Sequence, residues 1–217
     1  PARRTVFILR QICDSLEEAH RAGLIHRDIK PSNIYLCALG LQYDFIKVLD
    51  FGLVKSMSSP EISQMTMEGQ AAGTPAYMAP EVALGDRQID GRSDVYSLGC
   101  VAYYLLTGCL LLDEDTSTAT ALAHVQKTPV PPSERTELPV PADLEQLVLS
   151  CLAKKPEDRP HSAQELSRRL GALQCHGAWG REEAADWWQR NLPVTAPERV
   201  ATQSESAGVI LTSASGL

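Results

Sequence analysis

The residues of this chain best suited to chemistry lie in two short stretches. Residues 26–33 read HRDIKPSN and place a carboxylate at Asp28, an ammonium at Lys30 and a carboxamide at Asn33. A DFG tripeptide further along adds a second carboxylate, Asp50. Phosphoryl transfer needs this inventory, because it requires a group that orients the attacking hydroxyl, a cation for the moving phosphate and oxygen ligands for Mg²⁺.

Each stretch alone has a plain explanation, since an Asp followed two residues later by a Lys is usually a solvated surface pair. The occurrence of several motifs in a fixed order favours a functional explanation over this plain one. After the first two come GTPAYMAPE at 73–81, SDVYSLG at 93–99 and an arginine at 159. The ordered set resembles the eukaryotic-type, or Hanks-type, serine/threonine protein kinases. The sequence of the later segments is similar to that of the bacterial members of this family.

The resemblance covers residues 1–173 and implies the C-terminal lobe of the protein-kinase-like fold, an α+β fold that is here mainly α with a small β-hairpin. Residues 174–191 are expected to be an extension that could hold an amphipathic helix, and residues 192–217 a flexible or disordered tail. ATP and Mg²⁺ are the implied cofactors, and protein substrates with serine or threonine acceptors are the implied partners.

By the same resemblance, Asp28 accepts or orients the proton of the substrate hydroxyl, and Lys30 neutralises the γ-phosphate. Asn33 and Asp50 are the implied Mg²⁺ ligands. Thr74 matches the threonine that bridges Asp28 and Lys30, which makes it part of the implied catalytic set.

Other positions match residues that support the site. Tyr35 is expected beneath the adenine ring, and Phe51 against His26, with the flexible Gly52 after it. Asp94 resembles a buried carboxylate that binds backbone N–H groups of the catalytic loop.

Glu81 and Arg159 are expected to form a buried ion pair beneath the loop that receives the substrate. Arg27 resembles the arginine that reads a phosphate on the activation loop, and Thr66 is the best candidate acceptor of that phosphate. Ser63 and Ser59 remain weaker alternatives for this acceptor.

The pattern of apolar residues predicts the elements that position these groups. An amphipathic helix over 5–22 precedes the first motif and ends at Gly23. Two short aliphatic runs, 34–36 and 46–49, predict a hairpin between the two motifs. Residues 53–72 are polar and without period, which is typical of a mobile loop.

Several helices are predicted after that loop. The segment 94–107 is apolar nearly all round and should be the central buried helix. Weaker or shorter helices are expected over 116–126 and 143–153, and a capping box at Ser162 opens another. A proline-rich connector lies between them, and the run WGREEAADWWQR at 179–190 could form a helix with its tryptophans as anchors.

Composition places limits on the function. With 217 residues, 44% of them hydrophobic, the chain can build one domain, and its net charge of −7 argues against non-specific nucleic-acid binding. The six cysteines form no C-x-x-C pair, which favours a reducing, cytoplasmic compartment. No apolar run approaches the length of about 20 residues that a membrane span needs.

The chain contains no glycine-rich phosphate loop and no strand lysine of the kinase small lobe. We therefore interpret it as a fragment of a longer kinase, inactive by itself, with further domains upstream or downstream. One alternative is a non-catalytic, kinase-derived module that binds proteins. A weaker one is a small-molecule kinase, against which the GTPAYMAPE segment argues.

Overall fold

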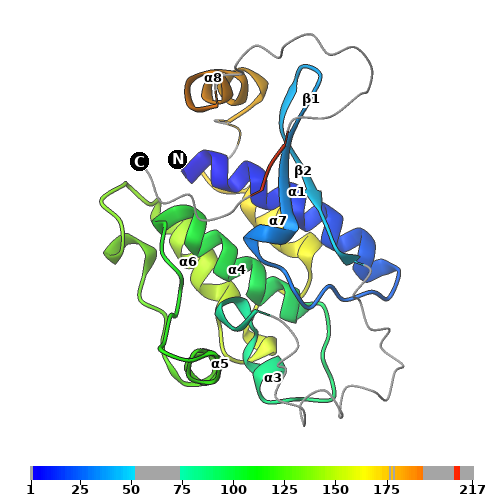
Figure 1. The fold of residues 1–217 in the computed structure, drawn as a ribbon, viewed down its shortest axis with the longest axis vertical. Coiled ribbons are helices and arrows are strands. Elements are labelled where there is room, and N and C mark those ends of the chain that lie inside the picture. Colours follow the sequence, from blue (N-terminus) through cyan, green and yellow to red (C-terminus); the bar gives the residue numbers. More distant parts are fainter. Residues whose placement is uncertain (1, 52–73, 176, 178, 193–207, 211–217) are drawn as a thin grey trace.

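The computed structural model describes residues 2–51, 74–175, 177, 179–192 and 208–210 (Figure 1). Helices make up most of this part of the chain, and the strands form one small sheet beside them, which confirms the predicted mainly α class with a small hairpin. The helices are α1 (Ala2–Arg21), α3 (Pro80–Ala83), α4 (Arg92–Thr107), α5 (Ser117–Gln126), α6 (Ala142–Cys151), α7 (Ala163–Gly171) and α8 (Arg181–Asn191). The strands are β1 (Ile34–Leu39), β2 (Gln42–Val48) and β3 (Gly208–Ile210).

Short 3-10 turns connect these elements. They lie at Pro31–Asn33, Pro75–Tyr77, Pro132–Glu134 and Pro156–Asp158, and each begins with a proline. Proline suits the first position of such a turn because its φ is already fixed near the helical value and it lacks the N–H that would stay unpaired there.

Helix α1 has one apolar face, on which Ile12 and Leu16 are completely buried. This face packs against α7 and α4. The structure confirms the predicted helix and extends it, because the range 5–22 begins at Ala2 instead. Gly23 follows the helix with a φ of 75°, a left-handed conformation that glycine adopts without steric cost.

Strands β1 and β2 form the predicted antiparallel hairpin, with Ile34 opposite Val48. Both strands are longer than the sequence pattern indicated, because the pairing continues to Leu39 and Gln42 at the turn. The hairpin therefore begins directly after the catalytic-loop motif and returns the chain to the DFG motif.

Strand β3 departs from the expected flexible tail. Gly208–Ile210 pair antiparallel with the free edge of β1, which gives the sheet the order β2-β1-β3. The Val209-Ile210 pair has high strand propensity, and the unpaired edge of a strand offers hydrogen-bonding groups to such a segment. The rest of the expected tail, residues 193–207 and 211–217, lies outside the described residues.

Helix α4 is the central helix, as predicted, and it contacts α1, α6 and α7. Its side chains are buried on almost every side, including Val95, Leu98 and Val101. Gly99 lets α6 approach closely, because a Cβ at this position would lie 2.8 Å from the Cβ of Cys151. The packing of the two helices therefore depends on the absence of a side chain there.

The predicted helices on either side of the proline-rich connector are present as α5, α6 and α7. At the start of α7, the Ser162 hydroxyl accepts a hydrogen bond from the Glu165 N–H at 3.0 Å. The Glu165 carboxylate accepts from the His161 N–H at 2.7 Å, one residue before the position that a reciprocal capping box would use.

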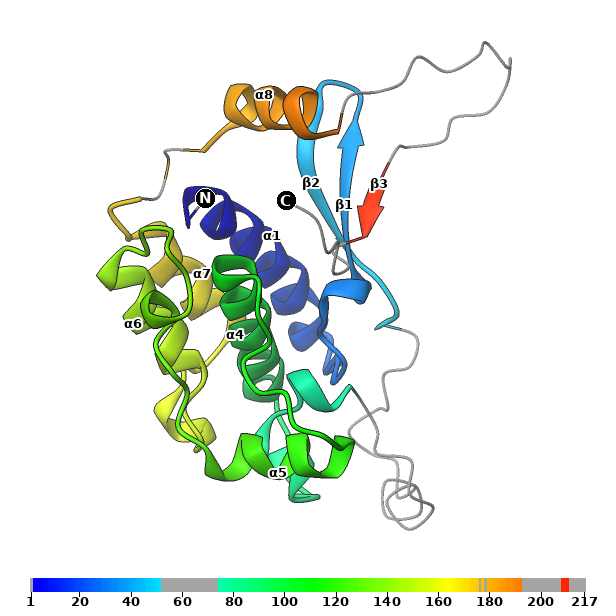
Figure 2. The same cartoon turned by 60° about the vertical axis from the view of Figure 1, so that its left-hand side comes forward.

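Helix α8 begins at Arg181, so that Trp179 precedes the helix in which the sequence pattern placed it. The N–H of Gly180 donates to the Glu183 carboxylate at 2.9 Å and closes the first turn. The helix lies across the far end of the hairpin, away from the catalytic loop (Figure 2).

Two further findings concern the chemistry of the whole chain. Among the described residues, no helix combines the length and apolarity that a membrane crossing requires. All six cysteines are free thiols. Burial raises the pKa of the Cys151 thiol to about 12, so this side chain behaves as a small apolar group.

Candidate active site

The hairpin brings the two motifs together at its open end. Asn33 precedes β1 and Leu49 follows β2, and the Leu49 N–H donates to the Asn33 carbonyl at 2.8 Å. The His26 ring reinforces this junction, since its Nδ1 accepts from the Asp28 N–H at 3.3 Å and its Nε2 lies 2.8 Å from the Leu49 carbonyl. The two contacts together require the tautomer that is protonated on Nε2.

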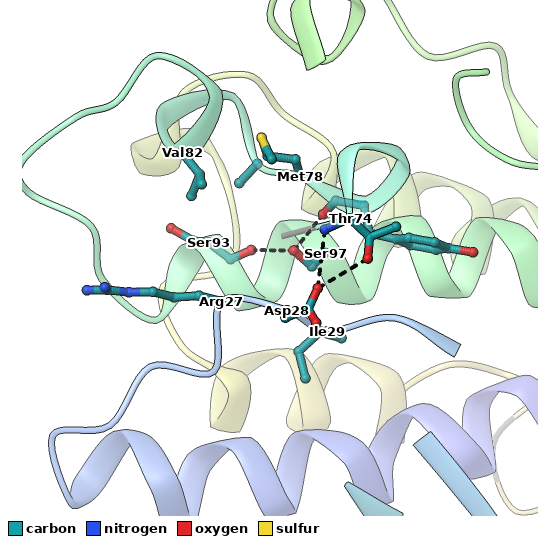
Figure 3. A pocket seen from close by; sticks show the side chains of 10 residues that line it. Arg27, Asp28, Ile29, Thr74, Met78, Val82, Ser93 and Ser97 are labelled. Carbon is teal, nitrogen blue, oxygen red and sulfur yellow. Dashed lines mark hydrogen bonds between the residues drawn. The ribbon is translucent and has the colours of Figure 1, made fainter. Parts of the chain in front are cut away.

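The side chains of Asp28, Lys30 and Thr74 form one connected cluster. Oδ2 of Asp28 lies 2.6 Å from the Lys30 ammonium. Lys30 also donates to the Thr74 hydroxyl oxygen at 2.8 Å. The Thr74 N–H and O–H then reach Oδ1 of Asp28 at 3.3 and 3.4 Å (Figure 3).

Asn33 joins the cluster from the end of the catalytic loop. Its Nδ2 donates to the Asp28 carbonyl at 2.8 Å and to Oδ2 of Asp28 at 3.1 Å. Because the amide nitrogen makes both contacts, the carbonyl oxygen of the Asn33 side chain is left to accept from another group or to bind a cation.

The catalytic loop is held from below by Asp94, which belongs to the first turn of α4 and is completely buried. The N–H groups of His26 and Arg27 donate to its two oxygens at 2.9 and 2.8 Å. Arg27 has a φ of 64°, a left-handed conformation that costs energy for a residue with a side chain. The two hydrogen bonds to Asp94 help to hold this backbone.

A third donor to Asp94 is His20, whose Nε2 lies 2.8 Å from Oδ2. The sequence analysis missed this residue, because it read as part of the amphipathic pattern of the first helix. Gly91 makes room for the ring, since a Cβ there would lie 2.6 Å from Nδ1 of His20.

The DFG motif lies partly within the described residues. Asp50 is exposed, with a φ of 64°, and it directly follows the Leu49 junction. The Phe51 ring meets the His26 ring edge to face, with 4.7 Å between the ring centroids. Gly52 and Thr66 lie outside the described residues, as does the whole of the predicted loop at 53–72.

A buried ion pair lies under the segment that follows this loop. Arg159 donates to both oxygens of Glu81 at 2.8 Å, and the Ser93 hydroxyl donates to Oε1 of Glu81 at 2.7 Å. Burial opposes ionisation of Glu81, but the hydrogen bonds and charge of Arg159 outweigh it, so the pKa of this carboxyl lies below its ordinary value.

Two more residues that the sequence analysis missed connect this pair to its surroundings. The Arg159 guanidinium lies 4.8 Å from the centre of the Tyr96 ring, and the Tyr96 hydroxyl lies 2.9 Å from Nδ1 of His124. His124 is completely buried, and burial lowers its pKa to about 4. Its sequence context gives no signal of this role, because it reads only as one position of a weakly amphipathic helix.

Tyr35 is the remaining predicted site residue. It lies on β1, half-buried, with Lys47 of β2 and Ile210 of β3 as its pairing partners. The structure therefore places it on the hairpin next to Asn33 but not in the Asp28 cluster.

Comparison with known proteins agrees with this geometry. Residues 1–169 match the protein kinase domain family. The chain is 47% identical over 158 residues to serine/threonine-protein kinase Pkn1 of Myxococcus xanthus, which covers 73% of the chain and 22% of that protein. It is 41% identical over 172 residues to serine/threonine-protein kinase pkn3 of the same organism, covering 78% of the chain and 31% of the relative.

A third relative is serine/threonine-protein kinase PknB of Mycobacterium leprae, 40% identical over 170 residues, which are 78% of the chain and 26% of that protein. The chain thus spans less than a third of the length of these curated relatives. The family match includes the Asp28 cluster, the hairpin, Asp94 and the Glu81–Arg159 pair, and it ends before α8. This chain belongs to the protein kinase family.

Proposed function

We propose that this chain provides the catalytic loop of an enzyme that transfers the γ-phosphoryl group of ATP to serine and threonine hydroxyls of proteins. The main support is the Asp28 cluster. One oxygen of its carboxylate is paired with Lys30 at 2.6 Å, and the other faces the N–H and O–H of Thr74. A carboxylate held in this way can orient a substrate hydroxyl next to a fixed positive charge.

In this proposal, the substrate hydroxyl oxygen forms a bond to the γ-phosphorus while the bond to the β–γ bridging oxygen breaks. ADP leaves with the electron pair of that bond, and the hydroxyl proton passes to Asp28. The transition state is loose and demands little base strength, so the position of Asp28 matters more than its pKa. Lys30 stabilises the charge on the moving phosphoryl group.

The residues present fit a Mg²⁺ site at the open end of the hairpin. The side-chain oxygen of Asn33 is free of the amide contacts that Nδ2 makes to Asp28, and the Asp50 carboxylate is exposed. Both are hard oxygen donors of the kind that Mg²⁺ prefers. When bound, the ion would offset negative charge on the leaving oxygen. The Leu49–Asn33 hydrogen bond keeps the two donors near each other.

We also assign Tyr35 to the floor of the adenine site, since it follows Asn33 by two residues on the hairpin. The small lobe that covers nucleotide in this family has no counterpart in the sequence motifs of residues 1–173. For the 217-residue chain alone we therefore expect Mg-ATP binding too weak to detect at millimolar nucleotide. Micromolar affinity in a calorimetric titration would contradict this part of the proposal.

Phosphorylation of the activation loop is the proposed form of regulation. Within the described residues, Nε of Arg27 is buried and has no hydrogen-bond partner. An arginine nitrogen in that state suits a phosphate, which supplies strong acceptor oxygens. We assign the phosphate to Thr66, and we expect Thr66→Ala to lower activity that depends on autophosphorylation.

The free cysteines support a reducing compartment, so we assign the chain to the cytoplasm of its cell. Proteins, not nucleic acids, are the proposed substrates, because the chain is acidic and the segment 74–81 carries the kinase substrate-platform motif.

An assay of the protein extended upstream to include a small lobe tests the proposal. We expect transfer of labelled phosphate from ATP to serine or threonine of a protein acceptor, with loss of at least about a hundredfold in Asp28→Asn and Asp50→Asn. Removal of Mg²⁺ with a chelator should abolish it. If the extended protein folds but transfers no phosphate, or the Asp28→Asn variant retains full activity, the proposal fails and the non-catalytic binding module is favoured.

A further inference from the structure

Another buried carboxylate, that of Asp44, lies at the far end of the hairpin from the active site. It belongs to β2, it is completely buried, and its φ of 56° is in the left-handed region. Arg4 of α1 donates to it through two nitrogens, Nε to Oδ2 at 2.9 Å and Nη2 to Oδ1 at 2.7 Å. The Gln11 amide donates to the Asp44 carbonyl at 2.8 Å.

The C-terminal extension supplies the other donors. The indole N–H of Trp179 donates to Oδ2 of Asp44 at 3.0 Å, and that of Trp188 donates to Oδ1 at 2.7 Å. Each carboxylate oxygen therefore accepts two hydrogen bonds, which fills its ordinary capacity. Both tryptophans are buried, with 7% and 6% of their surface exposed. The cluster is thus closed and satisfied within the chain itself.

Further contacts hold the extension to the same place. The Arg4 guanidinium lies 3.3 Å from the centre of the Trp187 ring, and Tyr43 of β2 packs against Trp188 with 5.9 Å between ring centroids. Arg181 donates to the Leu41 carbonyl at the hairpin turn at 2.9 Å. Residues 179–191 therefore contact both the hairpin turn and the adjoining part of β2 (Figure 2).

The hairpin connects this cluster to the active site. β1 starts directly after Asn33, and β2 ends two residues before Asp50, so a single pair of strands carries both proposed Mg²⁺ ligands. At the active-site end the two strands are joined by the Leu49–Asn33 hydrogen bond. At the other end the strands are held to α1 by the bonds of Asp44 to Arg4 and by those of Gln11 to the Asp44 carbonyl and the Ile46 N–H, and the extension adds its own bonds to Asp44.

We propose that residues 179–191 are a clamp that positions the β1–β2 hairpin, with Asp44 as its point of attachment and Trp179 and Trp188 as positioning residues. The clamp lies beyond residues 1–169, the segment that matches the kinase family. Its effect on catalysis rests on the proposed function, because it acts through the placement of Asn33 and Asp50. Its effect on the hairpin does not.

Hydrogen exchange in the 217-residue chain tests the clamp without any assay of activity. The double variant Trp179→Phe/Trp188→Phe removes both indole donors but keeps the aromatic bulk. We expect the Leu49 amide and its neighbours in β2 to exchange about tenfold faster, while the amides of the central helix α4 change by less than about twofold. Trp188→Phe alone should give a smaller change in the same amides, and it replaces the double variant if that variant does not fold.

Asp186→Asn is the matched control, because Asp186 lies on the exposed side of α8 and pairs only with Arg190 among the contacts of the described residues. It should leave the exchange of the hairpin at the wild-type rate. Wild-type exchange of the hairpin in the indole variants would overturn the proposal. So would equal acceleration in α4, since that outcome means general destabilisation.

Steady-state kinetics of the extended protein test the consequence for catalysis. We expect Trp188→Phe to raise KM for Mg-ATP about fivefold and to change kcat less, because the nucleotide-binding hairpin is disturbed and Asp28 is not. An unchanged KM would overturn the link between clamp and active site. If the wild-type extended protein transfers no phosphate, the proposed function fails. The exchange measurement still tests whether residues 179–191 position the hairpin.

Discussion

Two buried carboxylates hold two different regions of this molecule. Asp94 binds the catalytic loop, and Asp44 holds the far end of the β1–β2 hairpin to α1 and the C-terminal extension. Asp94 and Asp44 are both completely buried. Asp94 accepts two backbone N–H bonds from the catalytic loop and one from His20. Asp44 accepts only side-chain donors, from Arg4 and two tryptophans.

The difference in donors separates two ways of fixing a loop. Asp94 binds the backbone N–H groups of residues 26 and 27, so these two hydrogen bonds do not depend on the side chains there, as long as neither residue is proline. Asp44 holds specific side chains, one of them a cation, so each replacement of a donor by a residue without an N–H removes the bonds which that donor makes. The Asp94 contacts therefore depend mainly on the path of the backbone, and the Asp44 contacts depend on the residue types at 4, 179 and 188.

The most severe test of the comparison removes the carboxylate of Asp44. In Asp44→Ala the Arg4 guanidinium stays buried without a counter-charge, and two indole N–H groups lose their acceptor. Breaking one side of a buried ion pair costs about 3–5 kcal/mol, so we expect a loss of that size in the free energy of unfolding. Urea unfolding measures it. A loss below about 1 kcal/mol would mean that water replaces the carboxylate and that the cluster is not truly closed.

Unfolding at low pH tests whether a buried histidine, His124, contributes to the pH dependence of stability in addition to the two carboxylates. Burial, reinforced by the charge of Lys154, lowers the pKa of His124 from 6.5 to about 4, and Tyr96 bonds its Nδ1. Between these pH values the unfolded chain binds a proton at His124 that the folded chain does not. Stability should therefore fall as the pH drops from 6.5 towards 4, by up to about 3 kcal/mol.

The variant His124→Gln should show a shallower fall over this window when urea unfolding is compared at pH 7 and pH 4.5. Tyr96→Phe is its matched control, because it removes the hydroxyl but keeps the imidazole, and it should retain the pH dependence. An identical slope in His124→Gln and the wild type would assign the acid sensitivity to carboxylates instead.

Replacing Asp94 should cost less stability than replacing Asp44. Asp94→Asn keeps one acceptor oxygen, so either the Arg27 N–H loses its partner or the His26 N–H and His20 both lose theirs. We expect a loss of about 1–3 kcal/mol in the free energy of unfolding, and a much larger relative loss of phosphate transfer in the extended protein. A variant that is as active as the wild type would show that the catalytic loop does not need this support.

The smallest effect is expected on the outer face of α8. The Asp186–Arg190 pair is solvent-exposed and four residues apart on one helix, so Asp186→Asn should change the free energy of unfolding by less than about 0.5 kcal/mol. A larger change would mean that this exposed ion pair contributes substantially to the stability of α8. The Asp44 contacts would then explain less of the attachment of α8 to the hairpin.

The sequence predicted the Asp94 region well because its parts are motifs whose residues are close together along the chain. The loop at 26–33, the DFG carboxylate and the first turn of α4 each carry their own local signature. The amphipathic pattern likewise predicted α1 and the central helix. His20 was missed because it belongs to none of these motifs and reads as one position of the amphipathic first helix.

The Asp44 region could not be predicted in the same way. Its carboxylate meets Arg4 at a separation of 40 residues and Trp188 at 144. The tryptophans were expected to anchor a helix, but nothing in their spacing identifies the residue to which they bind. Asp44 itself reads as an ordinary polar residue near a hairpin turn. Strand β3 was missed for a similar reason, since its partner strand lies far away in the sequence.

Gly91 shows how a position that touches no reactant can still control the reaction. The space above its Cα is filled by the ring of His20, which reaches through it to Asp94. Even one methyl group at this position would push the ring aside and loosen the carboxylate that supports the catalytic loop. We therefore expect a substitution at residue 91 to disturb the catalytic loop, although a map of substrate contacts would never include this position.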